Sequence, residues 1–198
     1  MDFLAQLNYV EVLGVITGFL CVWLYIRQNV WSWPITIVSA ALFIVVFIQA
    51  QLYAATGLQG IYIILAVYGW YQWLYGGEQH SGVRVSHLTG VTAAVLLVLV
   101  AAGTGVLAFP LASYTNAALP LWDSLATVMS LAAQWMLAKK ILENWLVWIV
   151  ADALFVGIYL YQNLYLTAGL YVVYLGLAVS GFITWRKSMR TDEAAIEV

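Results

Sequence analysis

Long apolar runs separated by short polar breaks fill almost the whole chain. Each run reaches about 18–22 residues, which is enough for an α-helix to cross the hydrocarbon core of a bilayer. The pattern therefore predicts an all-α membrane protein with seven transmembrane helices. The predicted helices are Val10–Ile26, Trp33–Ala50, Leu58–Tyr75, Leu88–Phe109, Leu121–Ala138, Trp145–Tyr161 and Leu164–Trp185.

The predicted breaks between these runs are short, at residues 49–51, 76–78, 110–120 and 139–140. The polar, acidic tail at 191–198 is expected to fray. No stretch is long and polar enough for a second, soluble domain. We therefore expect a single membrane domain over residues 1–198.

Composition supports the same class of protein. Hydrophobic residues make up 65 % of the 198 residues and charged residues 8 %, and a soluble domain of this size cannot bury so much apolar surface. Cys21 is the only cysteine, which excludes an intrachain disulfide and a cysteine-based metal cluster. The first residues contain no basic cluster, so we expect no cleaved signal peptide.

All seven basic residues fall on one predicted side of the membrane. Under the positive-inside rule this side is cytoplasmic. We therefore expect a multi-pass protein of the inner (plasma) membrane, with its N-terminus outside and its C-terminus in the cytoplasm. The basic residues are Arg27, Arg84, Lys139, Lys140, Arg186, Lys187 and Arg190.

The chain also contains an internal repeat. A shift of 112 residues lays residues 11–73 on residues 123–185 without a gap, with 18 identities in 63 positions. Trp33 then meets Trp145, and Gly69 meets Gly181. Such shared positions are expected to be architectural.

The repeat predicts three helices, one connector and three helices, a 3+1+3 order. Repeat one covers 11–75, the connector helix 88–109 and repeat two 121–187. Because the offset spans four membrane crossings, the two repeats have parallel topology.

One face of the sixth predicted helix carries rings and a carboxylate. Trp145, Trp148 and Asp152 lie at i, i+3 and i+7, and the same stripe continues to Tyr159 and Asn163. A carboxylate at mid-membrane depth is costly and usually faces a protein interior or a wet cavity. Two indoles beside a carboxylate suit a flat, cationic guest, because ring faces stack on the guest and attract its charge. The alternative is a packing helix whose Asp bonds to a neighbouring helix.

The repeat shows that this chemistry belongs to the second half alone. Trp148 aligns with Thr36, and Asp152 aligns with Ala40. The carboxylate and the extra ring therefore favour one binding site rather than two.

Other polar residues in the predicted spans are weaker candidates. Asp123 opens the fifth predicted helix, where it either caps the helix or lines a polar lane. Gln59 and Tyr62 lie on one stripe of the third predicted helix, and a structural role for Gln59 is equally open. His80 and His87 lie in a predicted cytoplasmic loop and are interpreted as incidental.

Motifs of soluble enzymes are missing from the sequence. It contains no Gly-rich phosphate loop, no metal-ligand spacing and no nucleophile elbow. We expect no enzyme activity, no cofactor or metal, and no nucleic-acid partner.

Four segments together resemble the PnuC family of vitamin transporters. The resemblance covers nearly the whole chain, including the 3+1+3 order. The segments are Gln51-Leu-Tyr, Tyr68-Gly-Trp-Tyr-x-Trp73, Trp122-Asp-Ser and Glu143-Asn-Trp-x-x-Trp148.

The resemblance implies a SWEET-like fold, a homotrimer, and uptake of nicotinamide riboside by facilitated diffusion, with the substrate trapped by phosphorylation in the cytoplasm. The substrate motif of the family, Trp-x-x-Trp-x-x-x-Asn or Asp, falls on Trp145, Trp148 and Asp152. Many riboside carriers have Asn at the last position. The Asp of this chain therefore leaves thiamine, a substrate of related carriers, as the alternative.

We therefore predict a vitamin transporter of the lipid bilayer that takes up nicotinamide riboside for NAD biosynthesis. A non-transporting membrane scaffold or sensor module is the alternative class. A membrane-embedded enzyme is disfavoured, because Asp152 has no nucleophile, metal or second acid beside it. The predicted substrate-binding residues are Trp145, Trp148, Asp152, Gln59, Tyr62, Tyr159, Asn163 and Asp123.

Overall fold

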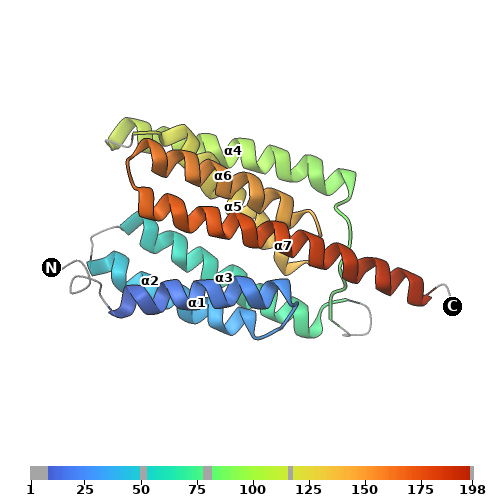
Figure 1. The fold of residues 1–198 in the computed structure, drawn as a ribbon. Coiled ribbons are helices and arrows are strands. Elements are labelled where there is room, and N and C mark those ends of the chain that lie inside the picture. The colour runs from blue at the N-terminus through green and yellow to red at the C-terminus, as the bar shows by residue number, and fades with distance from the viewer. Residues whose placement is uncertain (1–8, 50–52, 78–81, 116–117, 197–198) are drawn as a thin grey trace. The chain divides into compact units, whose positions relative to one another are not determined.

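Seven α-helices follow one another in the described part of the chain (Figure 1). The computed structural model describes residues 9–49, 53–77, 82–115 and 118–196. Within these residues the predicted all-α class and the predicted number of helices are confirmed. The helices are α1 (Tyr9–Ile26), α2 (Ser32–Gln49), α3 (Tyr53–Tyr75), α4 (Gly90–Tyr114), α5 (Pro120–Ala138), α6 (Asn144–Tyr161) and α7 (Tyr165–Ile196).

Four helical segments are long and apolar enough to cross a membrane: α2, α4, α6 and residues 165–191 of α7. α1 has 18 residues, and the part of it whose side chains are described, Leu13–Ile26, is apolar but shorter than a span. α3 and α5 have the length of a span but carry polar side chains such as Gln72 and Gln134. Membrane crossing by α1, α3 and α5 therefore stays a prediction.

Two predicted boundaries are wrong. Pro110 lies inside α4, which continues to Tyr114, because proline removes one backbone hydrogen bond and membrane helices tolerate that loss. α7 continues past Trp185 to Ile196, so residues 191–196 are helical rather than frayed. The added turns are rich in Arg, Lys, Met, Glu and Ala, which favour helix.

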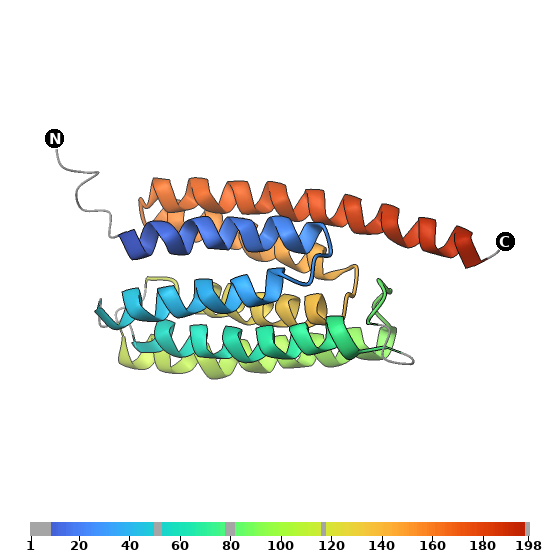
Figure 2. The same ribbon diagram turned by 90° about the horizontal axis from the view of Figure 1, so that it is seen from below.

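The chain divides into two compact units, Met1–Arg84 and Val85–Val198. In the first unit α1 packs on α2, and α2 packs on α3. In the second unit α4 packs on α5, α5 on α6, and α6 on α7. α7 has 32 residues and α6 has 18, so α7 is longer by on the order of 20 Å. Its C-terminal part projects beyond α6 (Figure 1), and Figure 2 shows the same helix from below.

The α1–α2 turn and the α5–α6 turn have matching backbones, 112 residues apart. Gln28 and Lys140 both have positive φ, 52° and 51°. The backbone N–H of each donates to the carbonyl three residues earlier, and both N···O distances are 3.0 Å. Each chain segment therefore reverses direction through one left-handed residue.

The residue that opens the following helix is also held in the same way in both turns. Ser32 Oγ donates to the Asn29 carbonyl at 2.7 Å, and Asn144 Nδ2 donates to the Ile141 carbonyl at 2.6 Å. Both side chains are fully buried. In both turns the side chain therefore donates to the carbonyl three residues earlier, although one donor is a hydroxyl and the other an amide.

In the first unit a tryptophan ring lies directly on a glycine. Trp33 of α2 covers Gly69 of α3, where an added Cβ would overlap the ring. The same ring meets Trp73 edge-to-face, with centroids 5.3 Å apart and planes at 89°. Tyr25 packs edge-on against Trp33 at 4.8 Å. These rings fix the contact between α2 and α3.

The second unit has the equivalent contact between α6 and α7. A Cβ on Gly181 would lie 2.6 Å from the ring of Trp145. Trp145 meets Trp185 edge-to-face, with centroids 5.4 Å apart and planes at 88°. The architectural role predicted for Trp145 and Gly181 agrees with this contact.

We predict that Gly181→Ala destabilises the protein by about 1–3 kcal/mol, because the added methyl overlaps a buried ring that has no room to move. Gly176→Ala is the matched control on the same helix, since nothing lies within 4 Å of its added Cβ. Thermal unfolding in detergent, followed by size-exclusion chromatography, measures both variants. Equal melting temperatures for the two variants would contradict the tight contact.

Candidate functional site

Asp152 lies in the middle of α6 and is only 4 % exposed. Its carboxylate makes no hydrogen bond or ion pair with any described residue. The alternative in which this Asp bonds to a neighbouring helix therefore has no support among the described side chains. A buried carboxylate without a partner is unfavourable by several kcal/mol in an apolar setting, so the position favours a cationic guest.

Trp148 lies one helical turn before Asp152, on the same face of α6. Its side chain is half-buried. It has no ring contact with another described residue, unlike the packed rings of Trp145 and Trp185. An indole without a ring partner beside an unpaired carboxylate offers stacking and charge together.

Trp145 has a different environment from Trp148, although both belong to the predicted stripe. It is 2 % exposed and packs on Gly181 and Trp185. Its indole N–H is buried without a hydrogen-bond partner among the described residues. These contacts hold α6 against α7.

Tyr159 lies in a group of four rings from α6 and α7. Its ring centroid is 6.1 Å from Phe155 and 5.2 Å from Tyr171, and Tyr171 in turn lies 5.9 Å from Tyr174. Phe155 and Tyr171 also touch, at 4.8 Å. The group lies toward the α6–α7 turn, beyond Asp152 along α6.

Asn163 does not continue the stripe, because α6 ends at Tyr161. It lies in the α6–α7 turn with φ of 60°, a conformation that asparagine tolerates better than most residues. Its Oδ1 accepts a hydrogen bond from the Tyr165 hydroxyl at 2.9 Å. Its predicted place on the helical face is therefore wrong.

The other predicted residues lie on other helices. Gln59 and Tyr62 belong to α3 in the first unit, and both are half-buried. Asp123 lies in the first turn of α5, as predicted, but its side chain makes no capping hydrogen bond. The polar lane that continues from Asp123 includes Ser130 and Gln134, which are both buried.

A contact that sequence reasoning missed fixes the start of α6. Ser86 pairs with Ile141 in a parallel bridge: the Ser86 N–H donates to the Lys140 carbonyl at 3.1 Å, and the Leu142 N–H donates to the Ser86 carbonyl at 2.9 Å. The segment before α4 is therefore bonded to the α5–α6 turn. We call this contact the clip.

Glu143 completes the clip immediately before α6. One carboxylate oxygen lies 2.7 Å from His87 Nδ1, and the other accepts from the Leu88 N–H at 2.8 Å. His87 is thus a structural partner rather than incidental, whereas His80 lies outside the described residues. A histidine and an acidic residue 56 residues apart were the only signal in the sequence.

Metal chemistry has no support in the described residues, where no group of three or more His, Cys, Asp or Glu side chains could hold an ion. The candidate residues of α6 are rings and one carboxylate.

Comparison with known proteins identifies the class. The sequence matches the nicotinamide mononucleotide transporter family over residues 8–187. The chain therefore belongs to this family of membrane transporters, and the predicted resemblance is confirmed. The protein is a transporter rather than an enzyme.

Two curated relatives have different named substrates. The chain is 26 % identical over 213 residues to the nicotinamide riboside transporter PnuC of Escherichia coli, covering 93 % of this chain and 88 % of that protein. It is 27 % identical over 191 residues to the riboflavin/roseoflavin transporter RibM of Streptomyces davaonensis, covering 94 % and 88 %.

A solved structure has the same fold. The crystal structure of the vitamin B3 transporter PnuC matches with a TM-score of 0.72 at 23 % sequence identity, over 94 % of this chain and 84 % of that chain. At this identity the likeness shows the fold alone.

We predict that Glu143→Ala destabilises the protein by about 1–3 kcal/mol, because a charged acceptor is lost from the Leu88 N–H and from His87. His87→Ala should cost less than about 1 kcal/mol, since its side chain is 62 % exposed. Thermal unfolding of both purified variants measures the difference. A larger loss for His87→Ala than for Glu143→Ala would show that the ion pair, not the backbone contact, dominates the clip.

Proposed function

We propose that this protein takes up nicotinamide riboside across the inner membrane, with Asp152 and Trp148 as the main contacts to the substrate. The observation that carries the proposal is Asp152, a residue only 4 % exposed whose carboxylate has no partner among the described residues, beside an indole without a ring partner there. A flat cation neutralises the carboxylate and stacks on the indole. Because an unpaired buried carboxylate is unfavourable, pairing it with a cation contributes strongly to the binding free energy.

Charge separates the possible substrates. Nicotinamide riboside carries a pyridinium ring and thiamine a thiazolium ring, so both are flat cations. The flavin ring of riboflavin is neutral and gains nothing from the charge of Asp152. A mononucleotide adds a phosphate, and α6 has no Lys or Arg to balance it. Thiamine is therefore the runner-up.

The remaining residues have supporting roles in this proposal. Trp145 packs against Gly181 and so fixes the first turns of helix α6, which carry Trp148. Tyr159 and Asp123 supply a hydroxyl and a carboxylate suited to a ribose. A role in recognition for Gln59 and Tyr62, which belong to the first unit, stays a prediction. Asn163 is left out, because its oxygen already accepts from Tyr165.

The fold proposal is a SWEET-like protein with a 3+1+3 parallel internal repeat, in which α4 is the connector. The matching turns at Gln28 and Lys140 support it, as do the matching Trp–Gly contacts at Gly69 and Gly181. From the family resemblance we also propose a homotrimer and transport by facilitated diffusion. Because the basic residues all fall on one predicted side, we propose that the N-terminus lies outside and the C-terminus in the cytoplasm.

We predict that Asp152→Ala and Trp148→Ala each lower riboside uptake by about tenfold or more, because each removes a charge or stacking contact to a cation. Radiolabelled uptake into proteoliposomes without an ion gradient measures this and tests facilitated diffusion. The matched controls are Val150→Ala on α6 and Trp122→Ala on α5, whose side chains are about half exposed, at 49 % and 51 %. Wild-type uptake by Asp152→Ala, at equal membrane levels, would refute the site.

A second prediction concerns the substrate. Calorimetric titration of purified protein should give binding of nicotinamide riboside and weaker or no binding of riboflavin. Asp152→Ala should weaken the riboside and leave any riboflavin binding unchanged, because only the riboside carries a positive charge. Tight binding of thiamine alone would keep the cation site and change the substrate. Tight binding of riboflavin alone would refute the role of charge.

A further inference from the structure

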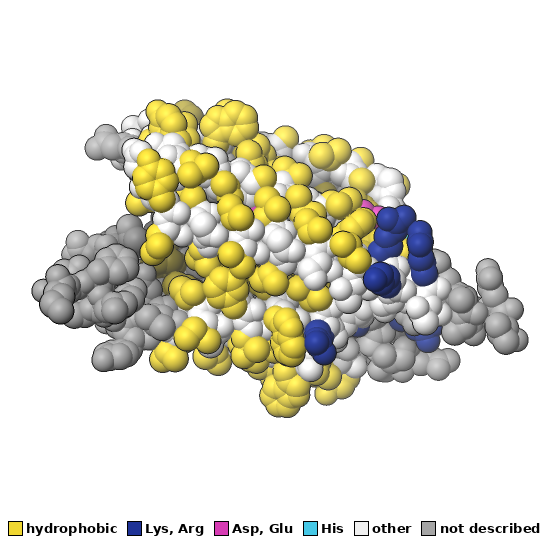
Figure 3. Space-filling model, viewed as in Figure 1, with side chains coloured by type: hydrophobic (Ala, Val, Ile, Leu, Met, Phe, Trp, Pro, Cys, Tyr) yellow, Lys and Arg dark blue, Asp and Glu magenta, His cyan; other side chains and the backbone are white. Residues whose placement is uncertain are grey.

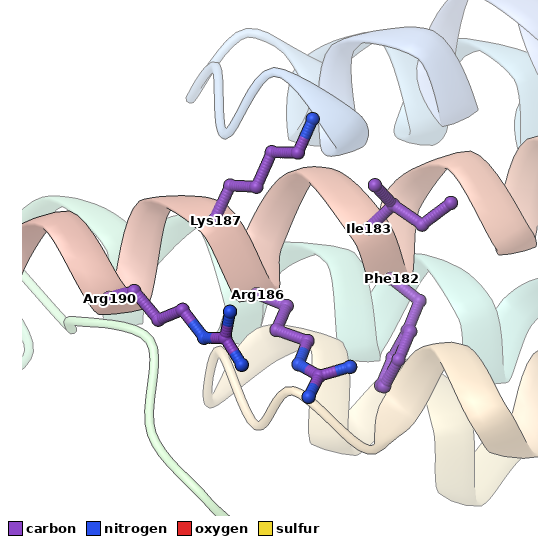
Figure 4. Close-up of a pocket in the computed structure, with 5 residues that line it drawn as sticks. All are labelled: Phe182, Ile183, Arg186, Lys187 and Arg190. Carbon is purple, nitrogen blue, oxygen red and sulfur yellow. The ribbon is translucent and has the colours of Figure 1, made fainter.

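A pocket opens at the basic end of α7 (Figure 4). It is an open pocket on the surface, with a volume of about 230 Å³, and it is lined by side chains of this one helix. The lining combines two apolar with three basic residues, Phe182, Ile183, Arg186, Lys187 and Arg190. The proposed transport site on α6 does not include any of them.

The lining residues form two stripes along α7. Phe182, Arg186 and Arg190 follow one another at intervals of four residues, and Figure 4 shows their side chains pointing to the same side of the helix. Ile183 and Lys187 are likewise four residues apart and point to the other side in the same view. Each stripe thus passes from an apolar side chain to a cation.

The three cations have no partner of opposite charge among the described side chains. None of them makes a hydrogen bond or an ion pair there, and all three are exposed. Arg186 and Arg190 are one helical turn apart, where like charges repel. An anion between the two guanidinium groups would relieve this repulsion, and a phosphate matches their planar donor geometry.

The pocket lies where the apolar part of α7 ends. The three basic residues lie in the C-terminal part of residues 165–191, a segment of α7 long and apolar enough to cross a membrane, and Ile183 is 49 % exposed. In the space-filling view, basic side chains gather beside a surface of apolar side chains (Figure 3). A ligand at this depth meets both the hydrocarbon edge and the charged surface of the membrane.

We propose that this pocket binds the headgroup of an anionic phospholipid. The phosphate lies between Arg186 and Arg190, and the acyl chain follows Phe182 and Ile183 toward the bilayer. A basic pocket next to apolar helix surface is the chemistry that recognises such lipids. The apolar lining favours a lipid over a free phosphate, which has no group to place against Phe182.

Native mass spectrometry of the full-length protein in detergent tests the proposal. Phosphatidylglycerol and phosphatidylcholine, which differ in headgroup charge, are added at equal concentration. The wild-type protein should retain phosphatidylglycerol about 30-fold more than phosphatidylcholine, in line with the contribution of two surface cations. Equal retention of the two lipids by the wild-type protein would overturn the proposal without any variant.

Variants locate the site. Arg186→Gln/Arg190→Gln should lose most of the preference, and Arg186→Lys/Arg190→Lys should keep most of it because the charge remains. Lys139→Gln/Lys140→Gln removes two charges of the same predicted membrane side and serves as the control. A loss of preference in this control as large as in Arg186→Gln/Arg190→Gln would show a diffuse surface charge and overturn the assignment.

A last arm separates a lipid from a soluble phosphate. Inorganic phosphate at millimolar concentration should fail to displace phosphatidylglycerol, and Phe182→Ala should weaken retention of the lipid. Displacement by phosphate together with unchanged retention in Phe182→Ala would mean that the pocket is an anion site without a lipid role.

Discussion

The contact of a tryptophan ring with a bare glycine backbone sets the spacing of the helices in each unit. Trp33 on Gly69 and Trp145 on Gly181 leave no room for even one added methyl group. Both indole N–H groups are buried without a hydrogen-bond partner among the described residues, so the packing of the rings must outweigh that cost. Because Trp145 is one turn before Trp148 and two turns before Asp152, the same contact sets the rotation of the candidate site about the axis of α6.

Two constraints therefore act on α6 near its first turn. The ring of Trp145 fixes the helix against α7, and Glu143 fixes the preceding turn to the segment before α4. Both lie at the N-terminal end of α6, and Asp152 lies further along the helix. A carboxylate that stays buried and unpaired needs such a support, because a free helix would rotate it toward a polar partner or toward water. The residues that hold α6 in place are thus different from the carboxylate that we propose as a substrate contact.

Most of the fold was predictable from the sequence, because apolar runs of membrane length leave the backbone few alternatives to helix. The repeat also indicated that Trp145 and Gly181 are architectural. The wrong predictions about helix ends and turns share one cause: where a helix ends depends on a few local residues, which the long apolar pattern does not report. Helix formers after Trp185 extend α7, Pro110 fails to stop α4, and Asn163 adopts a left-handed turn. The contact of His87 with Glu143 was out of reach because nothing in sequence periodicity reports a pair in two different loops.

The two matching turns carry almost no matching side chains. Between Gln28 and Ser32 in one turn and Lys140 and Asn144 in the other, none of the five aligned residues is identical, yet the left-handed residue and the hydrogen bonds of the backbone coincide. What the two segments share is a shape that many sequences can adopt. The number of identical residues therefore understates the structural similarity of the two halves, and it does so most in these turns. Distant members of such a family are better aligned by backbone dihedral angles there than by residue type.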